Sequence, residues 1–269
     1  MLKSQIKNSI RVACFTVVDL LKLRSLYLLF TVFLLVIIIG TGIKNPTEHS
    51  ARFRFAQLLY FHIISTGALL FTVLLSMEAI RKDIEAGRIL MYLSCQVSRT
   101  SYLFGRLAGI NIVVFLFMFF LHISLSVKIT MQTGVFPGGI PEASIICVLC
   151  NMFLSGLIVL ISFFTPGFIA AMVGLFVAGT SFFIDTIHMI MNSELVNGLL
   201  KNSIDKTNWF KAIWPKIFAF QYQIGNLIKN EDNLHQISMY PLINLVFYLF
   251  LVYLAMMVIF NKKDLNFES

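Results

Sequence analysis

Apolar runs of about 20 residues alternate along this chain with short polar segments. A helix needs about 20 apolar residues to cross the ~30 Å hydrocarbon core of a bilayer, because each residue adds about 1.5 Å. Six runs meet that length and predict six transmembrane helices at residues 26–43, 58–77, 107–127, 144–164, 167–184 and 240–260. The pattern is typical of an all-α, polytopic membrane protein whose residues 1–269 form a single domain.

The fourth and fifth runs are nearly continuous, and a proline lies at the point that divides them. As one helix, residues 144–184 would be about 60 Å long, roughly twice the hydrocarbon thickness. Proline disfavours helix at the residue before it, and an adjacent glycine permits a turn. The sequence Thr165-Pro166-Gly167 therefore predicts a tight cytosolic turn between two spans.

Lysine and arginine residues near the span ends indicate the orientation of the chain. Because the number of predicted spans is even, both termini lie on the same side of the membrane. The segment between spans two and three lies on that side too. That side carries Lys3, Lys7, Arg11, Lys22, Arg24, Arg81, Lys82, Arg88, Arg99, Arg106, Lys262 and Lys263. Basic residues in short flanking segments favour the cytosolic side. We therefore expect both termini to be cytosolic, in a bacterial plasma (inner) membrane.

The segment 5–21 has the pattern of a helix that lies on the membrane surface. Its apolar stripe is Ile6, Ile10, Ala13, Val17 and Leu21, and a neighbouring stripe carries Lys3, Lys7 and Arg11. An apolar face beside a basic face suits the boundary between acyl chains and headgroups. The pattern predicts an N-terminal interfacial helix, and the alternative is a simple extension of the first span.

The long loop 185–239 contains a second amphipathic pattern. Apolar residues recur on one helical arc, and Pro215 divides the arc into two predicted short helices. These residues are Trp209, Phe210, Ile213, Trp214, Ile217 and Phe218. We expect amphipathic helices on the outer face, which act as a structural cap or as a substrate gate.

Composition strengthens the membrane prediction and excludes other classes. Hydrophobic residues make up 58% of the chain and charged residues 13%, whereas soluble domains carry about 25% charged residues. The mean hydropathy is +0.85. The net charge of +8 is better explained by contact with anionic lipid headgroups than by nucleic-acid binding, because the basic residues flank the spans.

Polar residues inside the spans are few, and they favour packing over ion transport. They are His62, His122, Asn151 and Asn244. A proton relay would need carboxylates at the same depth, but Glu78 and Asp185 stand at span ends, where we expect them to reach water. The two histidines are therefore interpreted as hydrogen-bonded packing residues, with a proton relay as the alternative.

Short motifs that could carry chemistry are scarce. The sequence contains no G-x-x-x-x-G-K-[ST] phosphate loop, the motif with which many proteins bind ATP.

Cys147 and Cys150 share a helix face and are interpreted as packing residues, with a metal or redox site as the alternative. Gly105 and Gly109 form a G-x-x-x-G, a weak signal for helix dimerisation. An intramembrane enzyme would need a paired nucleophile and base, for which Ser155 and His122 are the only weak candidates. We therefore expect no catalytic site.

The polar segment between spans two and three carries a family resemblance. It contains Asp83-Ile84-Glu85-Ala86-Gly87, Leu90-Met91-Tyr92-Leu93-Ser94, Val97-Ser98-Arg99 and Tyr102-Leu103-Phe104-Gly105-Arg106. A second matching run lies near the C-terminus, at 254–265. In these segments the chain resembles permease subunits of ATP-binding-cassette (ABC) transporters of the type-2 exporter class. It is especially similar to nitrous-oxide-reductase-maturation and gliding-motility permeases. Gln96 departs from the pattern, because the family usually has proline there.

The resemblance implies a function and a set of partners. A cytosolic coupling helix at about 83–93 would dock on a separate nucleotide-binding subunit, which would hold ATP and Mg²⁺, so no cofactor is expected on this chain. The contact residues would be Arg81, Asp83, Ile84, Glu85, Arg88, Leu90 and Leu93. A second permease, expected to be an identical copy, and a possible periplasmic protein are the other implied partners. The relatives suggest sulfur or copper species, peptides, drugs or lipids as exported substrates.

An ion-coupled secondary transporter or a channel is the alternative function. Such a carrier usually holds its ion near the bilayer midplane, on a buried carboxylate or a broken helix. The sequence shows no Asp or Glu at the centre of a predicted span.

Overall fold

The computed structural model is helical throughout the part of the chain that it describes. The described residues are 2–40, 51–79, 83, 87–89, 92, 97–134, 136, 139–191, 214–227 and 239–262. They form eight helices and contain no strand, which confirms the all-α prediction for these residues. The helices are α1 (Leu2–Leu21), α2 (Arg24–Gly40), α3 (Ala51–Ala79), α6 (Arg99–Thr133), α7 (Gly139–Ser162), α8 (Gly167–Met191), α11 (Ile217–Leu227) and α12 (Met239–Lys262).

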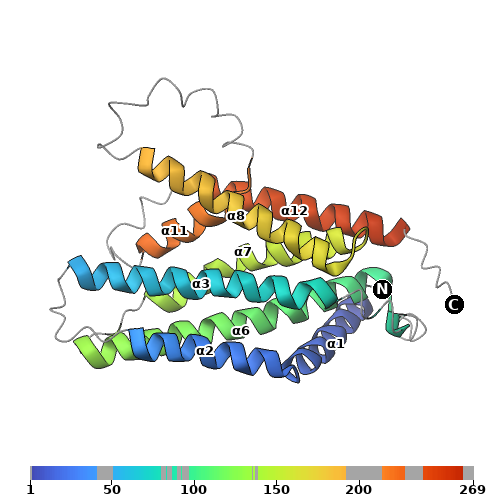
Figure 1. Ribbon diagram of the computed structural model, residues 1–269. Helices are drawn as coiled ribbons and strands as arrows, with labels where there is room; N and C mark the ends of the chain where they lie inside the picture. Colours follow the sequence, from blue (N-terminus) through green and yellow to red (C-terminus); the bar gives the residue numbers. More distant parts are fainter. Residues whose placement is uncertain are drawn as a thin grey trace.

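The long helices lie side by side in a bundle, with α7 at its centre (Figure 1). Helix α7 packs against α3, α6, α8, α11 and α12. The start of α1, the start of α6, the turn between α7 and α8, and the end of α12 lie at one end of the bundle, and α11 lies at the other (Figure 1). We call these the α1 end and the α11 end.

Five of the described helices are long and apolar enough to cross a membrane. They are α3, α6, α7, α8 and α12, and they correspond to the second to sixth predicted spans, of which the fourth runs two residues past the end of α7. Helix α2 forms most of the first predicted span, but it has 17 residues and passes the same test only together with α1 as a bent pair. The structure therefore supports five spans, or six if that pair counts as one.

The predicted break between the fourth and fifth runs is confirmed. Helix α7 ends at Ser162 and α8 begins at Gly167, directly after Pro166. A Cβ atom on Gly167 would lie 2.3 Å from the carbonyl oxygen of Met77. The turn thus needs glycine, because the backbone of α8 closely approaches the end of α3.

Helix α6 is the longest described helix and extends past the bilayer core. Its 35 residues correspond to about 52 Å. Ser98 caps its first turn by accepting a hydrogen bond from the backbone N–H of Ser101, and Gly134 ends it with a positive φ of 78°. Near that end the Lys128 ammonium donates to the carbonyl oxygens of Ile37 and Ile38. A cation there stabilises the negative C-terminal end of α2.

Candidate functional site

The segment between α3 and α6 is the predicted docking element, and the structure describes part of it. Of the seven predicted contact residues, Asp83 and Arg88 are described, whereas Arg81, Ile84, Glu85, Leu90 and Leu93 lie outside the described residues. Ile89, next to Arg88, is fully buried. It packs in a cluster with apolar side chains of α1, α6, α7 and α12, so Ile89 is packed onto the α1 end of the bundle.

Asp83 points into the protein and is fully buried. The Tyr102 hydroxyl donates a hydrogen bond to its carboxylate, with an O···O distance of 2.5 Å. The guanidinium of Arg106 lies 2.6 Å from the same carboxylate oxygen, and that of Arg88 lies 3.2 Å from the other. A buried carboxylate is tolerated when charges and hydrogen bonds of this kind compensate for its lost hydration. Asp83 is therefore already paired within its own chain.

The charge pairing continues onto α1. The Arg106 guanidinium donates to the Thr16 hydroxyl at 3.1 Å, and that of Arg88 lies 3.6 Å from the Asp19 carboxylate. Two arginines and two aspartates balance, so this charged cluster (Asp19, Asp83, Arg88 and Arg106) has no formal net charge. It joins the segment after α3 to both α1 and α6.

Two glycines allow α1 to lie close against α6. A Cβ atom on Gly105 would be 2.6 Å from the carbonyl oxygen of Ser9, and one on Gly109 would be 2.5 Å from the Cβ of Thr16. Small residues spaced four apart let two helix backbones approach. In this chain, the G-x-x-x-G motif therefore serves a contact within the molecule.

The opposite side of α1 is exposed and apolar. Ile6 and Ile10 are 54% and 57% exposed, and the neighbouring Lys7 and Arg11 are exposed too. The helix axis bends by 69° between α1 and α2, and α1 lies obliquely at the end of the bundle (Figure 1). One side of α1 is therefore apolar and uncovered by the described residues, and its placement on the membrane surface stays a prediction.

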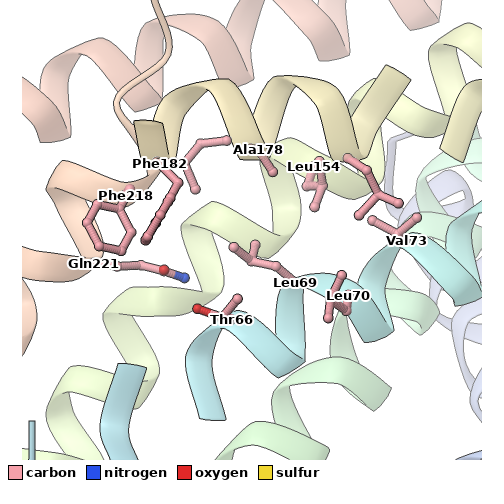
Figure 2. A pocket seen from close by; sticks show the side chains of 12 residues that line it. Thr66, Leu69, Leu70, Val73, Leu154, Ala178, Phe182, Phe218 and Gln221 are labelled. Carbon is pink, nitrogen blue, oxygen red and sulfur yellow. The ribbon is translucent and has the colours of Figure 1, made fainter. Parts of the chain in front are cut away.

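A pocket of about 300 Å³ lies between α3, α8 and α11. Figure 2 shows its lining side chains converging from these three helices, with Leu154 of α7 behind them. The lining is apolar except for Thr66 and Gln221, which face each other at the α11 side (Figure 2). This pocket could not be predicted from the sequence, because its lining residues come from four separate helices.

The expectation that Asp185 reaches water at the end of its span is wrong. Its side chain is buried, and the Lys216 ammonium lies 2.9 Å from one carboxylate oxygen. The other oxygen accepts a hydrogen bond from the backbone N–H of Ala219 at 2.8 Å. Asp185 thus caps the first turn of α11 and ties it to α8.

Substituting Asp185 tests this connection. We expect Asp185→Ala to lower the free energy of unfolding by about 1–3 kcal/mol, because the cap and the partner of Lys216 are both lost. Asp185→Asn keeps an acceptor for Ala219 and should cost less. Thermal unfolding of the purified protein in detergent measures the difference. Equal stability of Asp185→Ala and the unsubstituted chain would contradict the capping role.

Three of the four polar residues predicted in the spans, His122, Asn151 and Asn244, make hydrogen bonds to other segments, whereas the His62 ring stacks on Tyr222 and its Nδ1 has no hydrogen-bond partner among the described residues. His122 of α6 contacts the Ser144 hydroxyl at 2.6 Å, and Thr72 of α3 donates to the Asn151 side chain at 3.2 Å. Asn244 accepts a hydrogen bond from the backbone N–H of Lys216. These contacts fit packing roles for His122 and the two asparagines, because buried polar groups in spans need partners.

Ser155 and His122 do not meet. Ser155 is hydrogen-bonded to Asn111, whose amide in an apolar run is a sequence signal for such a pair. Ser155 is 11 residues beyond the Ser144 that binds His122, or about 16 Å along α7. The two side chains therefore cannot act as nucleophile and base together in this conformation.

Cys147 and Cys150 are fully buried in α7. The Cys150 thiol lies 3.8 Å from the carbonyl oxygen of Ile217, and both cysteines belong to the main apolar cluster of the bundle. Among the residues that the structure describes, no group of three or more His, Cys, Asp or Glu side chains gathers around a common point. The contacts of the two cysteines are those of packing residues.

The helical bundle and its apolar surfaces define a multi-pass membrane protein. Comparison of the sequence with protein-family models and with curated proteins finds no match.

Proposed function

We propose that this chain is the transmembrane permease subunit of an ABC transporter of the type-2 exporter class. A separate nucleotide-binding subunit would bind ATP and Mg²⁺, and this chain would couple ATP hydrolysis to export of a substrate. The observation that carries the proposal is the buried pairing of Asp83 with Arg106 and Tyr102. It fastens the segment after α3 to the start of α6, and a docking element needs such a connection in order to transmit movement.

The contacts suggest a path for the movement. A partner that pushes on the segment 83–93 would displace Asp83 and Ile89, and both are packed against the α1 end of the bundle. Arg106 would carry the displacement into α6, and its contact with Thr16 would carry it into α1. ATP binding changes the bundle only if the partner favours one arrangement over another, so the energy comes from the nucleotide-binding subunit.

A second permease subunit also fits the proposal. Buried residues make up 28% of the span in α8 and 22% in α12, against 61% in α3. The two helices thus leave large apolar surfaces for bilayer lipid and for another copy of the chain.

The test is co-purification of an ATPase. We expect the affinity-tagged chain, extracted in mild detergent from the membranes of its own host, to retain a stoichiometric partner with vanadate-sensitive ATPase activity. Leu90→Asp should remove that partner, because a buried carboxylate is costly in an apolar groove. Arg88 is a poorer probe, since it also pairs with Asp19 and Asp83 in its own chain.

Phe136→Asp is the matched control. Phe136 is 52% exposed and follows α6 at the α11 end, so the same chemical change there should leave the ATPase bound. If the unsubstituted chain carries no ATPase and moves a solute in vesicles along an imposed ion gradient, the proposal is wrong. That result would favour the ion-coupled carrier.

A further inference from the structure

The pocket between α3, α8 and α11 has the form of a binding site that faces the membrane. Its volume of about 300 Å³ is at the lower end of the range for small-molecule pockets. Leu70, Leu175 and Phe182 line it and are also exposed on the surface of the bundle. They belong to two membrane-spanning helices, so the pocket has an entrance between α3 and α8 that bilayer lipid can reach.

The polarity of the pocket changes along its length. Val73 and Leu154 line the part of the pocket that is farther from α11, and they make that part apolar (Figure 2). At the α11 side, the Gln221 amide and the Thr66 hydroxyl point toward the cavity (Figure 2). Gln221 is 2% exposed, and its amide opens onto the cavity (Figure 2). A buried amide is costly without a partner, and a ligand can supply one.

The charges around the pocket limit the head group of a ligand. No side chain that lines it is ionisable. Lys216 precedes the lining residue Ile217, but its ammonium is paired with Asp185 at 2.9 Å. A phosphate or carboxylate would therefore find no available cation among the described residues at this site, whereas a hydroxyl or an ester could pair with Gln221 and Thr66.

We propose that this pocket binds an uncharged acyl lipid of the surrounding bilayer. The acyl chain would occupy the apolar part between α3 and α8, and the hydroxyl or ester head would bind Gln221 and Thr66. The site needs this chain and a bilayer alone, so it does not rest on the proposed transport function.

Photochemical labelling in vesicles tests the proposal. The purified chain is reconstituted in phosphatidylcholine vesicles with a diacylglycerol that carries a diazirine in its acyl chain, and labelled positions are mapped by mass spectrometry. A phosphatidylglycerol with the same photoactivatable chain is run in parallel. We expect diacylglycerol to label pocket residues such as Leu69 and Phe182 more strongly than phosphatidylglycerol does.

Two variants on one helix give a matched comparison. Gly179 lines the pocket, and a Cβ atom added there meets no heavy atom within 4 Å, so Gly179→Leu should extend a side chain into the pocket. We expect it to reduce pocket labelling about tenfold, as the loss of contact with about two methylene groups would. Phe176→Leu is the control, because Phe176 is 65% exposed on α8 and lies outside the lining.

A third variant tests the head-group contact. Gln221→Leu keeps the bulk but removes the amide, so the preference for diacylglycerol over phosphatidylglycerol should fall. The proposal is overturned if pocket residues are labelled no more than Phe176, if Gly179→Leu changes nothing, or if phosphatidylglycerol labels equally well. Labelling of the unsubstituted chain decides between these outcomes even where a variant fails to fold.

Discussion

Asp83→Ala is expected to destabilise the protein by roughly 3–5 kcal/mol, the largest effect among the substitutions considered. The reason is the partner left behind, because removing one member of a buried ion pair leaves an uncompensated charge. The side chain of Arg106 is 8% exposed and lies 2.6 Å from Asp83. Thermal unfolding in detergent, followed by size-exclusion chromatography, measures the loss.

Two further variants test whether the loss of stability comes from leaving a buried charge unpaired. Asp19→Asn should cost less than about 1 kcal/mol, because the Asp19 side chain is 30% exposed and lies 3.6 Å from Arg88. The double variant Asp83→Leu with Arg106→Leu should recover much of the stability, since it leaves neither charge unpaired. If Asp83→Ala is no more damaging than Asp19→Asn, the buried pairing does not hold the segment in place.

Gly105→Leu is expected to displace α1 from α6, at a cost of about 1–3 kcal/mol. A Cβ atom on Gly105 would lie 2.6 Å from the backbone oxygen of Ser9. A backbone atom cannot rotate away as a flexible side chain can, so α1 has to move. Faster tryptic cleavage after Lys7 and Arg11, together with a lower melting temperature, would report the displacement.

Gly179→Leu provides the comparison for that experiment. It is the same substitution in another long helix, at a position where an added Cβ meets open space. Its melting temperature should equal or exceed that of the unsubstituted chain, because a mid-helix glycine is replaced by a better helix former. Equal behaviour of the two variants would show that α1 does not depend on close contact at Gly105.

The spans and the turn between α7 and α8 could be predicted because their signals are local. Each apolar run supplies its own length, and Pro166 and Gly167 mark the break within the sequence that contains them. Helix α6 begins at Arg99, eight residues before its predicted span. Hydropathy predicts only the part of a helix that lies within the lipid. It does not predict the first residue of the helix, which can lie outside the lipid.

The partners of the charged residues could not be predicted in the same way. Asp83 lies in a polar segment, and such residues usually face water or a partner. Its burial depends on Tyr102 and Arg106, which follow about 20 residues later on another helix. Asp185 was misjudged for the same reason, since Lys216 and Ala219 reach it from beyond the long loop.

The length of α6 has a consequence for how the protein responds to membrane thickness. Its ~52 Å exceeds the hydrocarbon core by about 20 Å. A helix with such an overhang adapts to a thinner or thicker bilayer by changing its tilt. At one end the tilt is opposed by α1, which is bound through Arg106 and Thr16. The displacement caused by a change of tilt is then greatest at the far end of α6, where Lys128 contacts α2. A change of bilayer thickness should therefore alter the distance between α6 and α2 at that end first.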